Sequence, residues 1–213
     1  MNLTFDRGAH ICHLFENPNE QKEVALGVLK AGLSRGDHCV HLTSEPSVDH
    51  PYADFQTGGI DVASERAKGS LEVVSAIDWY LESDFHSVTQ ARRLWRMIES
   101  SLELFDGVSL TADMRWTFEH LSTEELCHWE ATANLVFENV EVCTVCQYDL
   151  GYHSPGEIYS ALRTHPLVIY AGSARPNPYY EAPTILANEP YLNGSGANAK
   201  KVAAMLSTLR NGS

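Results

Sequence analysis

The sequence lacks any apolar run that approaches the roughly 20 residues needed to cross a bilayer. No early apolar stretch resembles a signal peptide either, because Asp6, Arg7 and His10 interrupt the first one. Basic residues are scarce, since 15 Lys and Arg stand against 28 Asp and Glu, and the formal net charge is −13. Nucleic-acid affinity comes largely from clustered basic residues, so direct nucleic-acid binding is disfavoured. We expect a soluble, cytoplasmic protein with no membrane partner.

Several catalytic signatures are also missing. The sequence has neither a G-x-S-x-G nucleophile elbow nor an H-E-x-x-H zinc motif, which disfavours a hydrolase. Its five cysteines are an odd number, which in a cytosolic chain indicates free thiols rather than a disulfide framework. The length of 213 residues suits one domain with a short extension.

The residues after the first predicted strand do not form a phosphate loop. The sequence there is FENPNEQKE, which has no glycine, and Lys22 is not followed by Ser or Thr. Three acidic residues lie where phosphates would sit, so charge opposes phosphate binding as well. We therefore expect no ATP hydrolysis by the P-loop mechanism and no enzymatic activity of that kind.

What is present is an alternation of strand and helix signals. Helices are predicted after Asn17-Pro18, along an apolar stripe from Val88 to Leu102, over 123–140, after the capping box at Ser154, and near the end at 202–209. Between them, strands are predicted at 8–15, 38–43, 60–62, 71–75, 108–111, 142–148 and 167–171. This order predicts an α/β fold, a three-layer sandwich with a mostly parallel sheet flanked by helices.

Two His/Cys pairs are candidates for metal binding. His10 and Cys12 point to one face of the first strand, and Cys39 and His41 do the same on the second. If these strands were neighbours, the four side chains would suit zinc. The alternative is a set of buried thiols and hydrogen-bonded core histidines, and we assign no metal or other cofactor on this pattern.

Cys143 and Cys146 form a C-x-x-C sequence within an apolar strand. Strand positions three apart face opposite sides, so the two thiols are predicted to diverge. A shared metal or a redox site is therefore disfavoured.

Glu130 is predicted to lie on the apolar face of its helix, where a carboxylate needs a partner or a proton. Residues 97–149 contain eleven acidic side chains and one base, Arg115, which makes Arg115 the predicted partner of Glu130. The pair is either a structural ion pair or a polar anchor in a ligand crevice with Trp116 as an apolar wall. His165, before the apolar strand LVIYAG, is either a ligand contact or a helix-end residue.

Together these residues resemble the MEDS domain, the methanogen/methylotroph DcmR sensory domain. The resemblance is carried by HICHLF with its acidic-Asn loop, AGLSRGDHCVHL, DMRW, Glu130 with Asn134, CQYD, and HPLVIYAG followed by NPYY, from about Gly8 to Tyr180. It implies a RecA-like fold without a Walker A phosphate loop, with residues 1–180 as a sensory domain. Residues 181–213 would form an extension with a helix, packed on the domain or used in self-association.

The resemblance also implies a role in signal transduction and transcription regulation, through a small-molecule ligand such as a hydrocarbon derivative. The ligand contacts that it implies are His10, Cys12, Arg115, Trp116, Glu130, Cys146, Tyr148 and His165. No helix-turn-helix is evident, so the output would pass through a regulatory protein partner, or the chain is a piece of a longer regulator. Two alternatives stay open: a metal-binding protein or enzyme using His10 and Cys12 with nearby His or Cys residues, and an interaction scaffold without a ligand.

Overall fold

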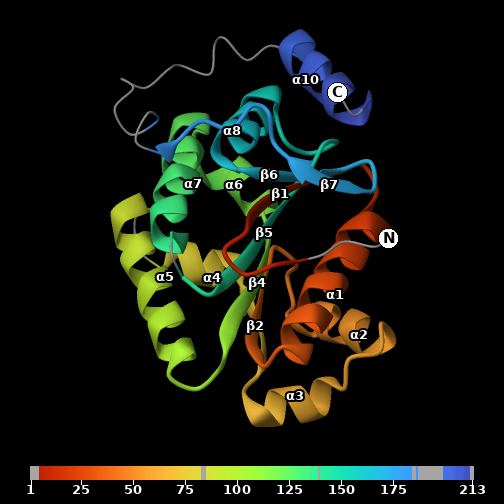
Figure 1. Cartoon of the computed structure of the whole chain (residues 1–213), viewed down its shortest axis with the longest axis vertical. Coiled ribbons are helices and arrows are strands. Elements are labelled where there is room, and N and C mark those ends of the chain that lie inside the picture. Colours follow the sequence, from red (N-terminus) through yellow and green to blue (C-terminus); the bar gives the residue numbers. More distant parts are fainter. Residues whose placement is uncertain (1–4, 83–84, 139, 184–185, 187–198, 212–213) are drawn as a thin grey trace.

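Seven strands form one sheet in the computed structural model, which describes residues 5–82, 85–138, 140–183, 186 and 199–211 (Figure 1). The strand order is β3-β2-β4-β5-β1-β6-β7. Strands β1 to β6 pair in parallel, and only β7 runs antiparallel to its neighbour, β6. The strand bounds are β1 His10–Phe15, β2 Asp37–Thr43, β3 Leu71–Ser75, β4 Gly107–Asp113, β5 Val142–Asp149, β6 Leu167–Tyr170 and β7 Ser173–Pro176.

Helices connect the parallel strands and cover both faces of the sheet (Figure 1). Helices α1, α2 and α3 lie on one face, and α4, α5, α7 and α8 lie on the other. The predicted three-layer α/β sandwich is therefore confirmed. The helix bounds are α1 Pro18–Ser34, α2 Asp49–Thr57, α3 Val62–Lys68, α4 Ala76–Leu81, α5 Ser87–Leu102, α6 Arg115–His120, α7 Thr123–Phe137, α8 Pro155–Thr164 and α10 Ala199–Asn211.

Local capping signals place several of these helices. The Asn17 side chain accepts a hydrogen bond from the backbone N–H of Asn19 at the start of α1, and β1 is joined to α1 by only Glu16 and Asn17. Ser154 and Glu157 form the predicted capping box of α8. These helix starts were predictable because capping depends on residues close together in the sequence.

Two predicted elements differ from the structure. Residues 60–62, predicted as a strand, end where α3 begins, because the Asp61 carboxylate caps the helix by accepting from Ser64 N–H. The predicted apolar stripe of α5 is largely exposed: Val88 is 55% and Trp95 44% exposed. Ile98 of that stripe is buried, and Gln90, Leu94 and Ser101 complete the buried side of α5.

The final helix, α10, packs on α8 and buries Val202, Met205 and Leu209 in the core that α7 and α8 also form. Tyr179 Oη donates to the Met205 carbonyl, which ties this helix to the segment after β7. Among the described helices, none is long and apolar enough to cross a membrane.

Candidate functional site

Four donor side chains meet on the α7–α8 face of the sheet: His10, Glu130, Cys146 and His165, here called the His–Glu–Cys cluster. His10 begins β1, Cys146 lies on the adjacent strand β5, Glu130 is on α7, and His165 caps α8 just before β6. One donor atom from each residue lies within 4.8 Å of all the others. All four side chains are buried, with at most 5% of any of them exposed. Parallel pairing of β1 with β5 and β6 thus brings together residues that are far apart in the sequence.

The distances within the His–Glu–Cys cluster are short. Glu130 Oε2 lies 3.5 Å from His10 Nε2 and 3.5 Å from His165 Nε2. Cys146 Sγ lies 3.5 Å from His10 Nε2 and 3.9 Å from Glu130 Oε2. The other carboxylate oxygen, Oε1, accepts a hydrogen bond of 2.6 Å from Tyr148 Oη. One carboxylate oxygen is therefore held by the protein, and the second faces the two imidazoles and the thiol.

Both histidines are oriented by hydrogen bonds on their outer nitrogen. The Asn134 amide nitrogen donates to the Thr164 and Glu130 carbonyls, so its oxygen faces His10 Nδ1 at 3.0 Å and accepts from it. His165 Nδ1 donates to the Ala161 carbonyl at 2.8 Å. In the neutral rings the remaining nitrogen, Nε2, therefore carries a lone pair directed into the cluster.

Burial sets the protonation of His165 and Cys146. It lowers the pKa of His165 to about 3, with the neighbouring His10 acting in the same direction, so His165 is neutral near pH 7. Burial, together with the Glu130 carboxylate, raises the pKa of the Cys146 thiol well above its ordinary value. Among the described residues, no Lys or Arg forms an ion pair with Glu130.

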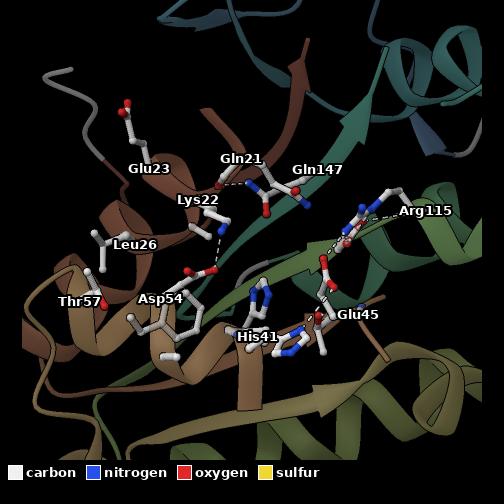
Figure 2. Close-up of a pocket in the computed structure, with 17 residues that line it drawn as sticks. Gln21, Lys22, Glu23, Leu26, His41, Glu45, Asp54, Thr57, Arg115 and Gln147 are labelled. Atoms are coloured by element: carbon white, nitrogen blue, oxygen red, sulfur yellow. Dashed lines mark hydrogen bonds and ion pairs between the residues drawn. The ribbon is translucent and has the colours of Figure 1, made fainter. Parts of the chain in front are cut away.

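A second feature lies on the opposite face, at the carboxyl ends of β2, β4 and β5 (Figure 2). It is a pocket of about 450 Å³ between these strand ends, α1 and α2, here called the carboxyl-edge pocket. Parallel α/β sheets characteristically bind ligands at this edge. Its lining includes Lys22, His41, Ala53, Phe55, Arg115 and Gln147.

Ion pairs surround the carboxyl-edge pocket. Lys22 on α1 lies 2.8 Å from Asp54 on α2, and Figure 2 shows this pair across the opening. Arg115 Nη2 lies 2.6 Å from Asp113 Oδ2 and 3.2 Å from Glu45 Oε1. With Glu23, the lining contains four acidic and two basic side chains. The pocket is therefore an unfavourable place for a polyanion.

Two buried polar groups face the same pocket. His41 Nδ1 lies 2.7 Å from the Thr111 hydroxyl, and burial lowers the pKa of His41 to about 4. Gln147 donates from its amide nitrogen to His13 Nδ1 and to the Gln21 carbonyl. Its amide oxygen is buried and has no hydrogen-bond donor among the described residues. Gln147 is therefore a polar residue of the pocket lining whose amide oxygen has almost no exposed surface.

The predicted ion pair between Arg115 and Glu130 is wrong. Arg115 begins α6 at the carboxyl end of β4 and is held there by Asp113, two residues earlier in the chain. Glu130 lies on α7 and contacts His10, His165 and Tyr148. The presence of a single base in residues 97–149 pointed to Arg115, but the partners of Glu130 come from other strands and are histidines.

The condition for a shared metal at His10, Cys12, Cys39 and His41, that β1 and β2 are neighbours, is not met. Strands β1 and β2 are separated by β5 and β4, so the two pairs cannot meet. Cys39 is in the core under α1, whereas Cys12 is in the core on the opposite face. The predicted divergence of the C-x-x-C cysteines is confirmed, because Cys143 and Cys146 lie in cores on opposite faces.

The eight predicted ligand contacts are thus divided. His10, Glu130, Cys146, Tyr148 and His165 are together in or beside the His–Glu–Cys cluster. Cys12 lies next to Cys146 in register but is not among the four donors. Arg115 lines the carboxyl-edge pocket, and Trp116 stacks on Tyr80 in an aromatic core.

Sequence reasoning missed most of the carboxyl-edge pocket. Thr43 and Asp113 end β2 and β4, and Gln147 lies two residues before the end of β5. Polar residues at the ends of predicted strands were a usable signal for this edge. Asp54 and Phe55 were missed for a different reason, since α2 has only short sequence signals.

Comparisons with known proteins agree with this fold. The FlaH flagellar accessory protein from Methanocaldococcus jannaschii, a solved structure, is similar, with a TM-score of 0.52 and 9% identity over 84% of this chain and 82% of that chain. At that identity the likeness shows the fold alone, which is RecA-like. No curated protein sequence matches the chain significantly. The family model described as the MEthanogen/methylotroph, DcmR Sensory domain matches residues 9–166, and because this range spans most of the chain, the protein belongs to the MEDS family.

Proposed function

We propose that this MEDS domain binds a small organic molecule in the carboxyl-edge pocket and passes the signal on through a protein contact. The observation that carries the proposal is the position of the pocket, at the carboxyl ends of three parallel strands. Its volume of about 450 Å³ suits a small ligand. A sensory role agrees with the family to which the chain belongs.

The lining favours a ligand that is uncharged or cationic. Phe55 and Leu26 supply apolar surface, while the Gln147 side chain and the His41 ring supply polar surface. The excess of acidic over basic side chains in the lining opposes an anion. A small hydrocarbon derivative with one hydrogen-bond donor meets these requirements.

The same features support the loss of nucleotide binding. Only Glu16 and Asn17 join β1 to α1, and Asn17 already caps the helix by accepting from Asn19 N–H. A phosphate loop needs several backbone N–H groups from a longer, glycine-rich connection. The domain would therefore act without ATP hydrolysis, as a binding module rather than an enzyme.

A ligand can signal only if it favours one conformation over another. The Lys22–Asp54 pair links α1 to α2 across the pocket, with both side chains partly exposed. A ligand beneath this pair would hold α2 closer to the sheet. The changed surface would then be read by a regulatory protein, which is how the domain would act on transcription.

The test is ligand binding with a matched pair of variants. Small alcohols, amines, aldehydes and halogenated methanes are screened by thermal shift and then titrated by calorimetry. Ala53→Trp places a bulky side chain in the pocket, and Ala67→Trp makes the same change on the exposed surface of α3. We expect A53W to abolish the thermal shift and A67W to retain it.

Hydrogen exchange tests the second part of the proposal, that ligand binding changes the position of α2. A bound probe should increase the protection of α2 and leave α10 unchanged. Equal binding by A53W and the unaltered protein would place the ligand elsewhere. A panel in which no compound binds at millimolar concentration would reject this ligand class.

A further inference from the structure

The His–Glu–Cys cluster has the spacing of a metal centre. A tetrahedral zinc ion with ordinary bonds to nitrogen, oxygen and sulfur separates its ligand atoms by about 3.3–3.6 Å. Three of the measured separations are 3.5 Å, from Glu130 Oε2 to each imidazole and from Cys146 Sγ to His10 Nε2. The fourth, from Cys146 Sγ to Glu130 Oε2, is 3.9 Å. Small side-chain shifts would bring all four atoms to one ion.

The orientation of the donor atoms is an independent observation. His165 Nε2 is fully buried, faces the cluster and has no hydrogen-bond partner among the described residues. An unpaired buried nitrogen is costly, so its presence calls for an explanation. His10 and His165 are both fixed through Nδ1 by an amide oxygen or a backbone carbonyl. Metal-binding histidines are characteristically held in this way by outer partners.

The charges of the donors also balance the charge of a divalent ion. A divalent ion bound by the Glu130 carboxylate and the Cys146 thiolate forms a neutral centre, with the thiol proton released to solvent on binding. Neutrality matters because the cluster is buried and no Lys or Arg pairs with Glu130 among the described residues. Imidazole, thiolate and carboxylate together suit zinc and similar divalent ions better than calcium or magnesium.

We propose that His10, Glu130, Cys146 and His165 bind one divalent transition-metal ion of the zinc class. This site lies on the α7–α8 face and goes beyond the proposed ligand pocket on the α1–α2 face. A surface hollow of about 370 Å³, lined by His10, Phe137, Pro166 and Tyr180 among others, reaches the edge of the cluster at His10.

A nucleophilic cysteine is the main rival explanation. Cys146, His10 and Asn134 are arranged as thiol, base and orienting amide, which is the order found in some cysteine hydrolases. Such a thiol needs a lowered pKa and access to substrate. Cys146 is buried, and the Glu130 carboxylate beside it disfavours the free thiolate. A bound cation would stabilise the Cys146 thiolate. The surroundings of Cys146 therefore suit metal binding better than nucleophilic catalysis.

The experiment uses untagged protein and cobalt as the spectroscopic probe. Elemental analysis measures the metal that copurifies, and the metal-free protein is titrated with Co²⁺. We expect one equivalent of metal, the intense visible bands of tetrahedral cobalt, and a near-ultraviolet thiolate-to-cobalt band. Cys146→Ser should remove the thiolate band, while Cys143→Ser, on the same strand but the opposite face, should leave it unchanged.

A variant of Asn134, which holds His10 from outside the cluster, is a further test of the metal site. Asn134→Ala removes the acceptor of His10 Nδ1 and should weaken cobalt binding by about 10- to 100-fold. The pocket variant A53W should bind cobalt normally, which separates this proposal from the ligand proposal. If Cys146→Ser fails to fold, the spectrum of the unaltered protein remains decisive.

Three results would overturn the metal site. The first is that the unaltered protein binds no cobalt, or binds it without a thiolate-to-cobalt band. The second is a thiolate band that survives in Cys146→Ser or disappears in Cys143→Ser. The third is rapid alkylation of Cys146 by iodoacetamide at neutral pH that depends on His10, because it would show a nucleophile instead.

Discussion

His13 is a buried histidine whose neutral form is required by its neighbour. Gln147 Nε2 donates to His13 Nδ1, and that nitrogen cannot accept once it carries a proton. Burial lowers the pKa of His13 from 6.5 to about 4. In the unfolded chain the ring takes up its proton as the pH falls below 6.5, whereas the folded protein resists until about pH 4. The unfolded state then binds more protons, so stability falls over this window.

His13→Gln should reduce this loss of stability in acid, because glutamine retains an acceptor and cannot titrate. For a pKa of about 4 in the folded state, the histidine costs about 2 kcal/mol of stability between pH 7 and pH 5. Urea unfolding of both proteins at the two pH values measures the difference. His50→Gln is the control, since the His50 side chain is 70% exposed. Parallel pH dependence of H13Q and the unaltered protein would contradict the prediction.

Asp37 is a fully buried carboxylate at the start of β2, and Asp37→Ala should be strongly destabilising. Its oxygens accept from Arg7, Arg35 and the buried Ser109 hydroxyl, at 2.6–2.9 Å for the shortest bond with each. Removing it takes the shared acceptor from all three donors, and we expect a loss of about 2–3 kcal/mol in the free energy of unfolding. Glu141→Ala removes the exposed partner of the same Arg7 and should cost less than about 0.5 kcal/mol. Equal effects of the two variants would refute the argument.

Single residues also show which features of the site could be predicted from the sequence. The burial of Glu130 was predictable from helix periodicity, because its position among apolar residues depends only on spacing along one helix. Its partners were not predictable, since His10 and His165 are separated from it by long stretches of chain. The unpaired nitrogen of His165 depends on three-dimensional contacts and left no signal in the sequence.

At the scale of elements, helix α1 lies very close to the sheet, and Gly32 makes this possible. A Cβ atom at Gly32 would lie 2.5 Å from Ser109 Oγ and 2.7 Å from Cys39 Sγ. Gly32→Ala should therefore destabilise the protein by about 1–2 kcal/mol, despite the better helix propensity of alanine. Gly27→Ala in the same helix meets only the edge of the Phe5 ring, at 3.2 Å, and should change stability by less than about 1 kcal/mol. Chemical denaturation of both variants tests the contrast, and a neutral G32A would mean that α1 can move away.

The elements themselves were largely predictable, and their order in the sheet was not. Caps such as Asn17 and Ser154 act within one turn of helix, so the sequence reveals them directly. The strand order places β4 and β5 between β2 and β1, and this order depends on how the connecting helices pack. For that reason the sequence left open whether β1 and β2 are neighbours, and with it a shared metal at their His and Cys residues. The two-face arrangement of Cys143 and Cys146 depends only on alternation along one strand, and it was predicted correctly.

At the scale of the whole molecule, we predict that Mg·ATP does not stabilise this RecA-like domain. The connection of β1 to α1 is too short for a phosphate loop, and the acidic lining repels a polyanion. Thermal unfolding with millimolar Mg·ATP should give the same midpoint as Mg²⁺ alone. A nucleotide-dependent rise in the midpoint that A53W abolishes would show that the pocket still accepts nucleotide.

The alternation of side chains along β5 has a thermodynamic consequence for the whole domain. Cys146 faces the His–Glu–Cys cluster and the next residue, Gln147, faces the carboxyl-edge pocket, so one peptide unit joins the two sites. Any factor by which zinc changes the affinity for the organic ligand must equal the factor by which the ligand changes the affinity for zinc. Titrating zinc and the organic ligand in either order measures this factor twice. A factor of one would mean that β5 carries both sites but that binding at one does not change the affinity of the other.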